Sequence, residues 1–295
     1  MPTASSDHVT LNLSPTLSGL PFRKMNGLGN DFVVLDLRQT TASVSEDDAR
    51  AIADRDHGIG CDQVVAIEAD FSGADAFMRI WNADGGEVAA CGNAARCVGW
   101  LLLEEAGRDT AAIRTSAETL CAVRAGAQRV TVDMGPPRLD WASIPLSEPF
   151  EDTRFIDVKL GPIDNPVLWG PSAVSMGNPH CIFFVEDAEA HALERFGPMV
   201  ENHPLFPERT NVEIAEVQSR EAIRLRVWER GAGITKACGT GACATLVAAV
   251  RRRLADRRAV VALDGGELDI EWREDGRVYM TGDIAFEFDG VLGVS

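Results

Sequence analysis

The two halves of this 295-residue chain repeat the same short motifs in the same order. The run Ala90-Cys91-Gly92-Asn93 in the first half matches Ala237-Cys238-Gly239-Thr240 in the second, with the two cysteines 147 positions apart. Three further pairs are separated by 147 or 148 positions: Trp81 and Trp228, Asn30 and Asn178, and Gln63 and Asn211. Chance rarely keeps four such matches in one order, so the repeat indicates an internal duplication. We therefore predict two domains of similar fold.

Short runs of β-forming residues alternate with polar turns along most of the chain. They cover residues 32–37, 64–67, 130–134, 181–185 and 223–228. Two other segments, 92–105 and 239–253, are long, rich in alanine and apolar on nearly every face. That pattern is typical of a helix enclosed by protein. One predicted helix follows Cys91 and the other follows Cys238.

The chain is long enough for two domains of roughly 100 to 200 residues each. Its 45% hydrophobic residues are sufficient for packed cores. The Pro-rich run Gly135-Pro136-Pro137 is the predicted domain boundary. Residues 1–21 are rich in Ser, Thr and Pro without regular periodicity, so we predict a loose N-terminal extension.

Composition excludes several classes of partner and location. With 45 acidic residues against 28 basic ones, the net charge of -17 argues against binding to nucleic acid or anionic membranes. No run approaches the roughly 18 apolar residues of a membrane span, and the N-terminus lacks the basic and apolar regions of a signal peptide. Seven cysteines spread along the chain do not resemble a secreted disulfide framework. We expect a cytoplasmic protein.

The repeated Cys-Gly pair indicates the chemistry. Each cysteine precedes the glycine that opens a predicted helix, where the partial positive charge and unpaired N–H groups lower the pKa of a thiol and bind a carboxylate. A pseudo-two-fold arrangement would bring Cys91 and Cys238 to one cleft. One thiolate could then remove the proton of an α-carbon while the other thiol delivers a proton to the opposite face. This pattern favours racemisation or epimerisation without a cofactor.

Other chemistries fit the sequence less well. The cysteine spacings C-x5-C and C-x4-C, with no clustered histidines, differ from those of zinc sites, so no metal is expected. Neither Gly27-Leu28-Gly29 nor Gly58-Ile59-Gly60 completes a dinucleotide-binding loop. Only three lysines are available for a Schiff base. We interpret three cysteines outside the repeated pair as small hydrophobic side chains: Cys97, Cys121 and Cys243.

Six segments of the chain resemble diaminopimelate epimerases. They are KMNGLGNDFVVLD (24–36), GIGCDQ (58–63), NADGGEVAACGNAARC (82–97), SMGNPHC (175–181), ERTN (208–211) and ERGAGITKACGTGACA (229–244). The resemblance implies the fold class α/β (α+β), with two pseudo-symmetric domains, each a mostly antiparallel curled sheet around a central helix. The implied boundaries are 1–21 for the extension, 22–137 plus 284–295 for the N-terminal domain, and 138–283 for the C-terminal domain.

The resemblance also implies roles for individual residues. Cys91 and Cys238 match the acid/base cysteines of that family, and His180 and Glu229 match residues that tune them. His180 could instead be a structural histidine at a strand edge, and Glu229 could serve substrate binding alone. Substrate contacts are implied for Asn30, Gln63, Asn82, Gly92, Asn93, Asn178, Asn211, Glu229, Arg230, Gly239 and Thr240. Neutral amides, one guanidinium and one carboxylate suit a substrate with amino and carboxylate groups at both ends.

The implied reaction is the interconversion of LL-2,6-diaminopimelate and meso-diaminopimelate, for lysine and peptidoglycan precursor synthesis, by a cofactor-independent cytoplasmic homodimer. The sequence is also compatible with two alternative functions. A proline racemase-like enzyme of the same fold also pairs two cysteines, but its substrate lacks the second amino-acid head that Arg230 and the amides would bind. A non-enzymatic thiol redox switch would use Cys91 and Cys238 as a regulatory disulfide, and thiol-dependent turnover separates it from an enzyme.

Overall fold

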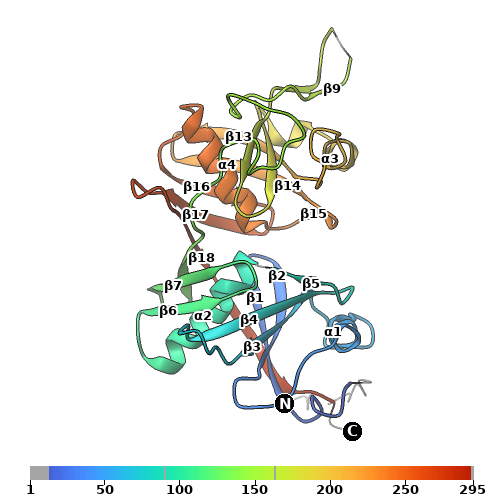
Figure 1. Cartoon of the computed structure of the whole chain (residues 1–295), viewed down its shortest axis with the longest axis vertical. Helices are drawn as coiled ribbons and strands as arrows, with labels where there is room; N and C mark the ends of the chain where they lie inside the picture. Colours follow the sequence, from blue (N-terminus) through green and yellow to red (C-terminus); the bar gives the residue numbers. More distant parts are fainter. Residues whose placement is uncertain (1–12, 90, 163, 294–295) are drawn as a thin grey trace, which may run out of the picture. The chain divides into compact units, whose positions relative to one another are not determined.

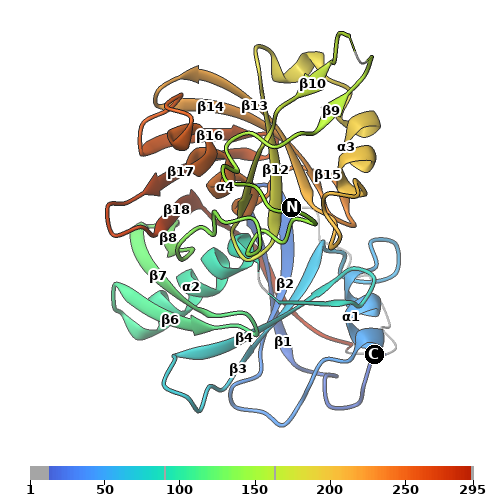
Figure 2. The same cartoon turned by 45° about the horizontal axis from the view of Figure 1, so that its top comes forward.

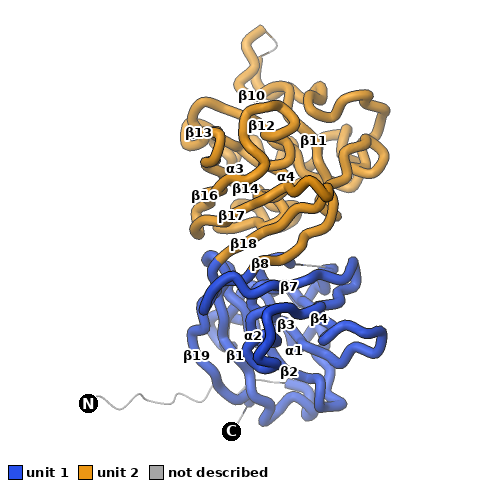
Figure 3. Tube along the Cα trace, turned by 90° about the vertical axis from the view of Figure 1, so that its left-hand side faces the viewer, with its two compact units in different colours: residues 1–130, 283–295 blue, residues 131–282 orange. Residues whose placement is uncertain are grey.

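The computed structural model describes residues 13–89, 91–162 and 164–293. The chain forms two compact units, which Figure 3 colours separately. Unit 1 comprises residues 1–130 and 283–295, and unit 2 comprises residues 131–282. The elements of unit 1 are β1 (Pro21–Gly27), β2 (Asn30–Asp36), α1 (Glu46–Ala53), β3 (Gln63–Glu68), β4 (Ala76–Asn82), β5 (Glu87–Val88), α2 (Gly92–Ala106), β6 (Thr110–Arg114), β7 (Thr119–Gly126) and β19 (Ala285–Val291).

Strand β8 (Arg129–Asp133) spans the boundary between the units. The elements of unit 2 are β9 (Lys159–Leu160), β10 (Leu168–Trp169), β11 (Ser172–Ser175), β12 (Pro179–Val185), η1 (Ala188–Ala190), α3 (Leu193–Glu201), β13 (Asn211–Ser219), β14 (Ala222–Glu229), β15 (Gly233–Thr235), α4 (Gly239–Arg251), β16 (Arg258–Leu263), β17 (Gly266–Trp272) and β18 (Val278–Asp283). Strand β18 ends at Asp283, which is the first residue of the segment that belongs to unit 1 again. All five β-forming runs identified in the sequence lie within strands or overlap them.

The two units share the same order and sense of strand pairing. In unit 1, the pairs β1–β2, β3–β4, β4–β5 and β6–β7 are antiparallel, whereas β2–β3 and β4–β6 are parallel. In unit 2, β11–β12, β13–β14, β14–β15 and β16–β17 are antiparallel, whereas β12–β13 and β14–β16 are parallel. This agreement confirms the predicted duplication and the mostly antiparallel sheets.

In each unit the strands curl around one central helix (Figures 1 and 2). Helix α2 contacts β1 and β2 as well as β6 and β7, and α4 contacts β11 to β14 as well as β16 and β17. Gly99 lets α2 approach β7 closely, because an added Cβ would lie 2.6 Å from the Cβ of Ala122. Helix α4 ends at Arg251, two residues before the predicted end, since Arg253 adopts a left-handed φ of 63°.

The chain passes from unit 1 to unit 2 within β8, before the Pro-rich run at which the sequence placed the boundary. Strand β8 pairs with β18, and the N–H of Met134 donates to the carbonyl of Val278 at 2.8 Å. These long-range hydrogen bonds associate residues 131–137 with unit 2. At Asp283 the chain returns to unit 1, where β19 pairs antiparallel with β1.

Residues 13–20 pack onto the rest of unit 1, although the sequence predicts that they are loose. Leu17 is fully buried. The N–H and hydroxyl of Ser14 donate to Asp48 at 2.7 and 2.8 Å, and the N–H of Gly19 donates to the carbonyl of Leu292. These contacts join parts of the chain that are distant in sequence, so local periodicity does not reveal them. Residues 1–12 of the predicted extension lie outside the described residues.

Replacing Asp48 with alanine should lower the free energy of unfolding by about 2 kcal/mol. The side chain caps α1 by accepting hydrogen bonds from Ser45, and it also binds Ser14. Urea unfolding measures the effect, with Asp47→Ala as the control, because the Asp47 side chain is 93% exposed in the same helical turn. Equal losses in the two variants would contradict the assigned role.

The same acid should make stability depend on pH. Burial opposes ionisation of Asp48, but hydrogen bonds from Ser45 and Ser14 outweigh it and lower the pKa of this carboxyl. Its contribution to stability is therefore complete above the unfolded-state pKa of about 3.9 and is lost as the pH falls through the lower folded-state pKa.

The described part of the chain contains no helix that is long and apolar enough to cross a membrane.

Candidate active site

Cys91 and Cys238 each occupy the N-cap position of a central helix. Helix α2 begins at Gly92 and α4 at Gly239, and both cysteines have extended backbone torsion angles. The prediction that a helix starts directly after each cysteine is confirmed. The first turn of a helix carries N–H groups that have no acceptor within the helix, and these groups can bind an anion. Each unit therefore places one thiol beside one potential carboxylate site.

The predicted site residues of unit 1 lie at the ends of β2, β3 and β4. Gln63 opens β3 and is paired with Asn82, the last residue of β4. The side chain of Gln63 donates to Asn82 Oδ1 at 2.9 Å, and the Cys91 thiol lies 3.9 Å from Oδ1 of Asn30 on β2. Gln63 Oε1 is buried, and no hydrogen-bond partner is found for it among the described residues. It is therefore an acceptor available to a ligand.

A charged network that we did not predict from the sequence holds Asn30. Its Nδ2 donates to Asp62 at 2.9 Å, and its Oδ1 is the atom nearest the Cys91 thiol in that contact. Arg55 donates to both Asp31 and Asp62, at 2.8 and 2.7 Å, and the buried Lys24 donates to Asp31. Burial opposes ionisation of Asp31, but hydrogen bonds from Arg55 and Lys24 hold its pKa well below the usual range. Asp62 lies within the GIGCDQ segment, beside Gln63.

In unit 2, a chain of polar contacts leads to Cys238. Fully buried His180 on β12 has its Nε2 3.0 Å from Asn178 Oδ1, and Asn178 Nδ2 donates to Thr240 Oγ1 at 3.4 Å. Thr240 Oγ1 lies 3.5 Å from Cys238 Sγ, and the N–H of Gly241 donates to the same sulfur at 3.4 Å. The structure thus joins four residues that the sequence named: His180, Asn178, Thr240 and Cys238.

The other predicted residues of unit 2 lie where β13 begins and β14 ends. Asn211 Oδ1 accepts a hydrogen bond from the backbone N–H of Arg230 at 3.0 Å. Glu229 accepts one from the hydroxyl of Thr235, and burial raises the pKa of its carboxyl. The Arg230 guanidinium donates to the carbonyl of Glu208 at 2.9 Å. Because this carbonyl is neutral, the contact does not compensate the positive charge of Arg230. A ligand carboxylate is therefore a suitable partner for the guanidinium.

The surroundings of Cys238 favour the protonated thiol. Burial raises its pKa well above the usual value, and the carboxylates of Glu229 and Glu213 raise it further. The hydroxyl of Thr240 and the N–H of Gly241 lower the pKa, but by less. We predicted the opposite direction from the helix N-terminus alone, and for Cys238 that prediction is wrong. Burial removes the water that would solvate a thiolate, and this loss outweighs the hydrogen bonds from Thr240 and Gly241 at the start of the helix.

The cysteines interpreted as small hydrophobic side chains fall into two groups. Cys97 and Cys243 are fully buried in α2 and α4, and burial raises the pKa of Cys97 to about 12. For Cys121 the interpretation is wrong, because this residue is exposed on β7. Its neighbours Leu120 and Ala122 are buried, as expected when successive side chains of a strand point to opposite faces.

Glu213 is the most deeply buried site residue that we did not predict from the sequence. It lies on β13 two residues after Asn211, and its Oε1 is 2.6 Å from His180 Nδ1. A signal was present, because Glu213 interrupts the apolar run of Val212, Ile214 and Ala215. Acidic residues are almost never fully buried without a partner, so this pattern indicates a paired carboxyl.

The predicted residues thus divide into two half-sites, one in each unit. The half-site of unit 1 comprises Asn30, Gln63, Asn82, Cys91, Gly92 and Asn93. The half-site of unit 2 comprises Asn178, His180, Asn211, Glu229, Arg230, Cys238, Gly239 and Thr240. Both half-sites contain a thiol at a helix N-terminus and amides at strand ends, as the duplication requires.

The chain is similar to known proteins both in structure and in sequence. In structure, the chain is similar to a hydroxyproline epimerase from Agrobacterium vitis, with a TM-score of 0.65, 16% identity and 93% coverage of both chains. It is also similar to a phenazine biosynthesis protein from Bacillus anthracis, with a TM-score of 0.66, 13% identity and coverage of 95% of this chain and 100% of the other. At these identities the likeness shows a shared fold.

Sequence relatives are much closer. Diaminopimelate epimerase from Phenylobacterium zucineum is 58% identical over 274 residues, covering 93% of this chain and 98% of the relative. The Caulobacter vibrioides enzyme of the same name is 53% identical over 279 residues, covering 92% and 96%. The family model for diaminopimelate epimerase matches residues 22–139 and 172–287. The chain therefore belongs to the diaminopimelate epimerase family.

Proposed function

We propose that this protein interconverts LL-2,6-diaminopimelate and meso-diaminopimelate, and so serves lysine and peptidoglycan precursor synthesis. The observation that carries the proposal is the placement of Cys91 and Cys238 at equivalent helix N-termini of two duplicated units. Inversion of an α-carbon needs one base and one acid on opposite faces. Two equivalent thiols meet this need without a metal, pyridoxal phosphate or a nucleotide.

In one direction, we assign Cys91 as the thiolate base and Cys238 as the thiol acid. The raised pKa of Cys238, caused first by burial and then by Glu229 and Glu213, supports its role as the acid. The Cys91 thiolate takes the α-proton, and the electron pair of the broken C–H bond delocalises into the adjacent carboxylate. Cys238 then delivers its proton to the opposite face of the α-carbon and becomes the thiolate. In the reverse direction the two roles exchange.

The substrate contacts follow from the chemistry of each group. The N–H groups at the starts of α2 and α4 suit the carboxylate at the reacting carbon, because helix N-termini bind anions. The buried Oε1 of Gln63, unpartnered in the described part of the chain, suits a substrate ammonium group. The Arg230 guanidinium suits the distal carboxylate, and the Glu229 carboxylate suits an ammonium group. His180 and Glu229 would tune the two cysteines.

The direct test is exchange of the α-proton of diaminopimelate with deuterated water, followed by mass spectrometry and chiral separation. The protein should incorporate deuterium while it interconverts the isomers, with a thiol reductant and a metal chelator present and without added pyridoxal phosphate. Activity that requires added metal or pyridoxal phosphate would contradict the mechanism. Absence of both exchange and interconversion in the folded, reduced protein would refute the function.

We also propose that the protein is a cytoplasmic homodimer. Strand β19 supports an interface, because large apolar side chains are unusually accessible along it. Phe286, Phe288 and Val291 are 41%, 46% and 50% exposed. Sedimentation equilibrium should give a mass of twice 31.8 kDa. A monomer mass throughout the micromolar range would contradict the dimer.

A further inference from the structure

A buried acid lies behind the histidine of unit 2. The side chains of Glu213 and His180 are both 0% exposed, and Glu213 Oε1 lies 2.6 Å from His180 Nδ1. The pairing follows from the sheet, because β12 and β13 run parallel with Asn211 opposite His180. Glu213 is two residues further along β13, so its side chain is on the same face as that of Asn211.

The contacts continue from this pair to the sulfur of Cys238. His180 Nε2 meets Asn178 Oδ1 at 3.0 Å, the Asn178 amide nitrogen donates to Thr240 Oγ1, and Thr240 Oγ1 is 3.5 Å from Cys238 Sγ. An amide oxygen can only accept, so His180 Nε2 must carry a proton in this arrangement. Glu213 can satisfy Nδ1 either as a carboxylate that accepts a hydrogen bond from an imidazolium, or as a carboxylic acid that donates one to the neutral ring. The Glu213 carboxyl thereby holds the end of this series of contacts that lies farthest from Cys238.

Glu213 and Cys238 also both lie beside Gly241, at the start of α4. A Cβ built on Gly241 would lie 2.9 Å from Glu213 Oε1 and 3.2 Å from Cys238 Sγ. Both atoms therefore border the space that this glycine leaves open. Glu213 Oε2 is buried and has no hydrogen-bond partner among the described residues. Burial raises the pKa of this carboxyl, whereas the contact with His180 lowers it. When Glu213 is ionised, its negative charge is poorly solvated and acts strongly on neighbouring groups.

Several charged and titratable groups surround the thiol. Glu213 faces it from β13 and Glu229 from β14, and both disfavour the thiolate, as does burial. His180 on β12 is linked to it through Asn178, and Cys181 on the same strand also senses the charge of Glu213. From α4 the Thr240 hydroxyl and the Gly241 N–H stabilise the thiolate.

We propose that Glu213 is a positioning residue for the epimerase reaction, which anchors His180 behind Cys238 and keeps Cys238 as the proton donor. This proposal rests on the proposed function of the two cysteines. An ionised carboxylate that acts on a thiol in a buried site outweighs one neutral hydrogen bond, which contributes about 1 kcal/mol. Glu213→Gln removes the ionised state of this side chain and should therefore make the Cys238 thiol easier to deprotonate, even if the Thr240 contact weakens.

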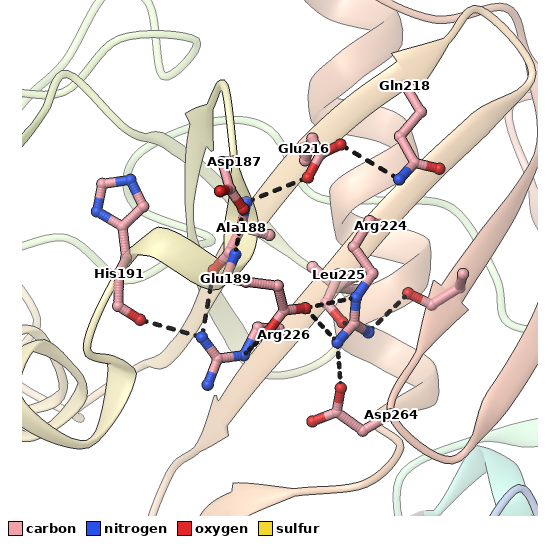
Figure 4. Close-up of polar contacts among 11 residues, drawn as sticks. Asp187, Ala188, Glu189, His191, Glu216, Gln218, Arg224, Leu225, Arg226 and Asp264 are labelled. Carbon is pink, nitrogen blue, oxygen red and sulfur yellow. Dashed lines mark hydrogen bonds and ion pairs between the residues drawn. The ribbon is translucent and has the colours of Figure 1, made fainter.

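The test compares Glu213→Gln with Glu216→Gln on the same strand. Glu216 contacts Gln218 and the backbone of Ala188 (Figure 4), and it is not among the residues whose contacts link His180 to Cys238. For Glu213→Gln, the alkaline limb of the kcat/KM profile should move to lower pH by about one unit, which corresponds to about 1.4 kcal/mol. The same variant should lose at least tenfold in kcat at neutral pH, about 1.4 kcal/mol. Glu216→Gln should keep the wild-type profile.

A folded Glu213→Gln variant with an unmoved alkaline limb would overturn the proposal while leaving the epimerase function intact. A wild-type protein that does not exchange the α-proton would instead refute the function. The imidazole ¹⁵N spectrum of the wild type provides a test that does not depend on how the variant folds. His180 Nε2 should remain protonated between pH 6 and 9, with its signal assigned by its loss in His180→Gln. An unprotonated Nε2 in that range would also overturn the proposal.

Discussion

Replacing either Cys91 or Cys238 with serine should reduce epimerisation at least about a thousandfold, within the range of losses for a positioned acid or base. A serine hydroxyl is a far weaker acid than a thiol, so near neutral pH it neither ionises to become the base nor releases a proton readily. Because each thiol serves one face of the α-carbon, neither can replace the other. The measurement is the rate of interconversion of the two diaminopimelate isomers by the purified, reduced variants.

Two other cysteines provide matched controls. Cys97 is buried in α2 close to Cys91, and Cys121 is exposed on β7. Cys97→Ser and Cys121→Ser should retain turnover if they fold, because neither thiol caps a central helix. Equal losses across all four folded variants would contradict the two-thiol mechanism. A wild-type protein with no turnover but with a reversible disulfide between Cys91 and Cys238 would favour the redox-switch alternative.

The second large effect concerns Arg230. Arg230→Lys keeps the positive charge but loses the planar group that can bind both oxygens of a carboxylate. If Arg230 binds the distal carboxylate, kcat/KM for diaminopimelate should fall at least tenfold, about 1.4 kcal/mol. Arg209→Lys is the control, because Arg209 is a nearby arginine of unit 2 that pairs with Glu201 at 3.2 Å and is 54% exposed. Similar losses in both variants would point to a general charge effect.

Substrate choice tests the same contact. The wild type should reject proline, which has no distal head, because Arg230 and the amides that would bind that head would be left unpaired. Each unpaired buried polar group costs roughly 1 to 3 kcal/mol. Comparable kcat/KM values for proline and diaminopimelate would favour the proline racemase-like alternative, although the two-thiol mechanism would stand. Chiral separation of the products measures both reactions.

Sequence signals were sufficient where the determining interactions are local or repeated. The Cys-Gly pairs and the apolar runs after them predicted the starts of α2 and α4, because helix starts depend on a few adjacent residues. The repeat predicted two units of similar fold, since equivalent segments pair their strands in the same way. The end of α4 was predicted less well, because the left-handed turn at Arg253 has no glycine to signal it.

Only the tertiary structure revealed the interactions between distant segments. Leu17 is buried by contacts with distant segments, and β8 pairs with β18 of unit 2. Because both interactions join distant parts of the sequence, local periodicity does not predict them. The pairing of Glu213 with His180 joins positions 33 residues apart. The sequence by itself therefore determined the family, the repeated fold and the two thiols. Tertiary structure decided that the Cys238 thiol prefers to be protonated. Burial and nearby carboxylates set the free energy of ionising this thiol, and both depend on residues that only folding brings together.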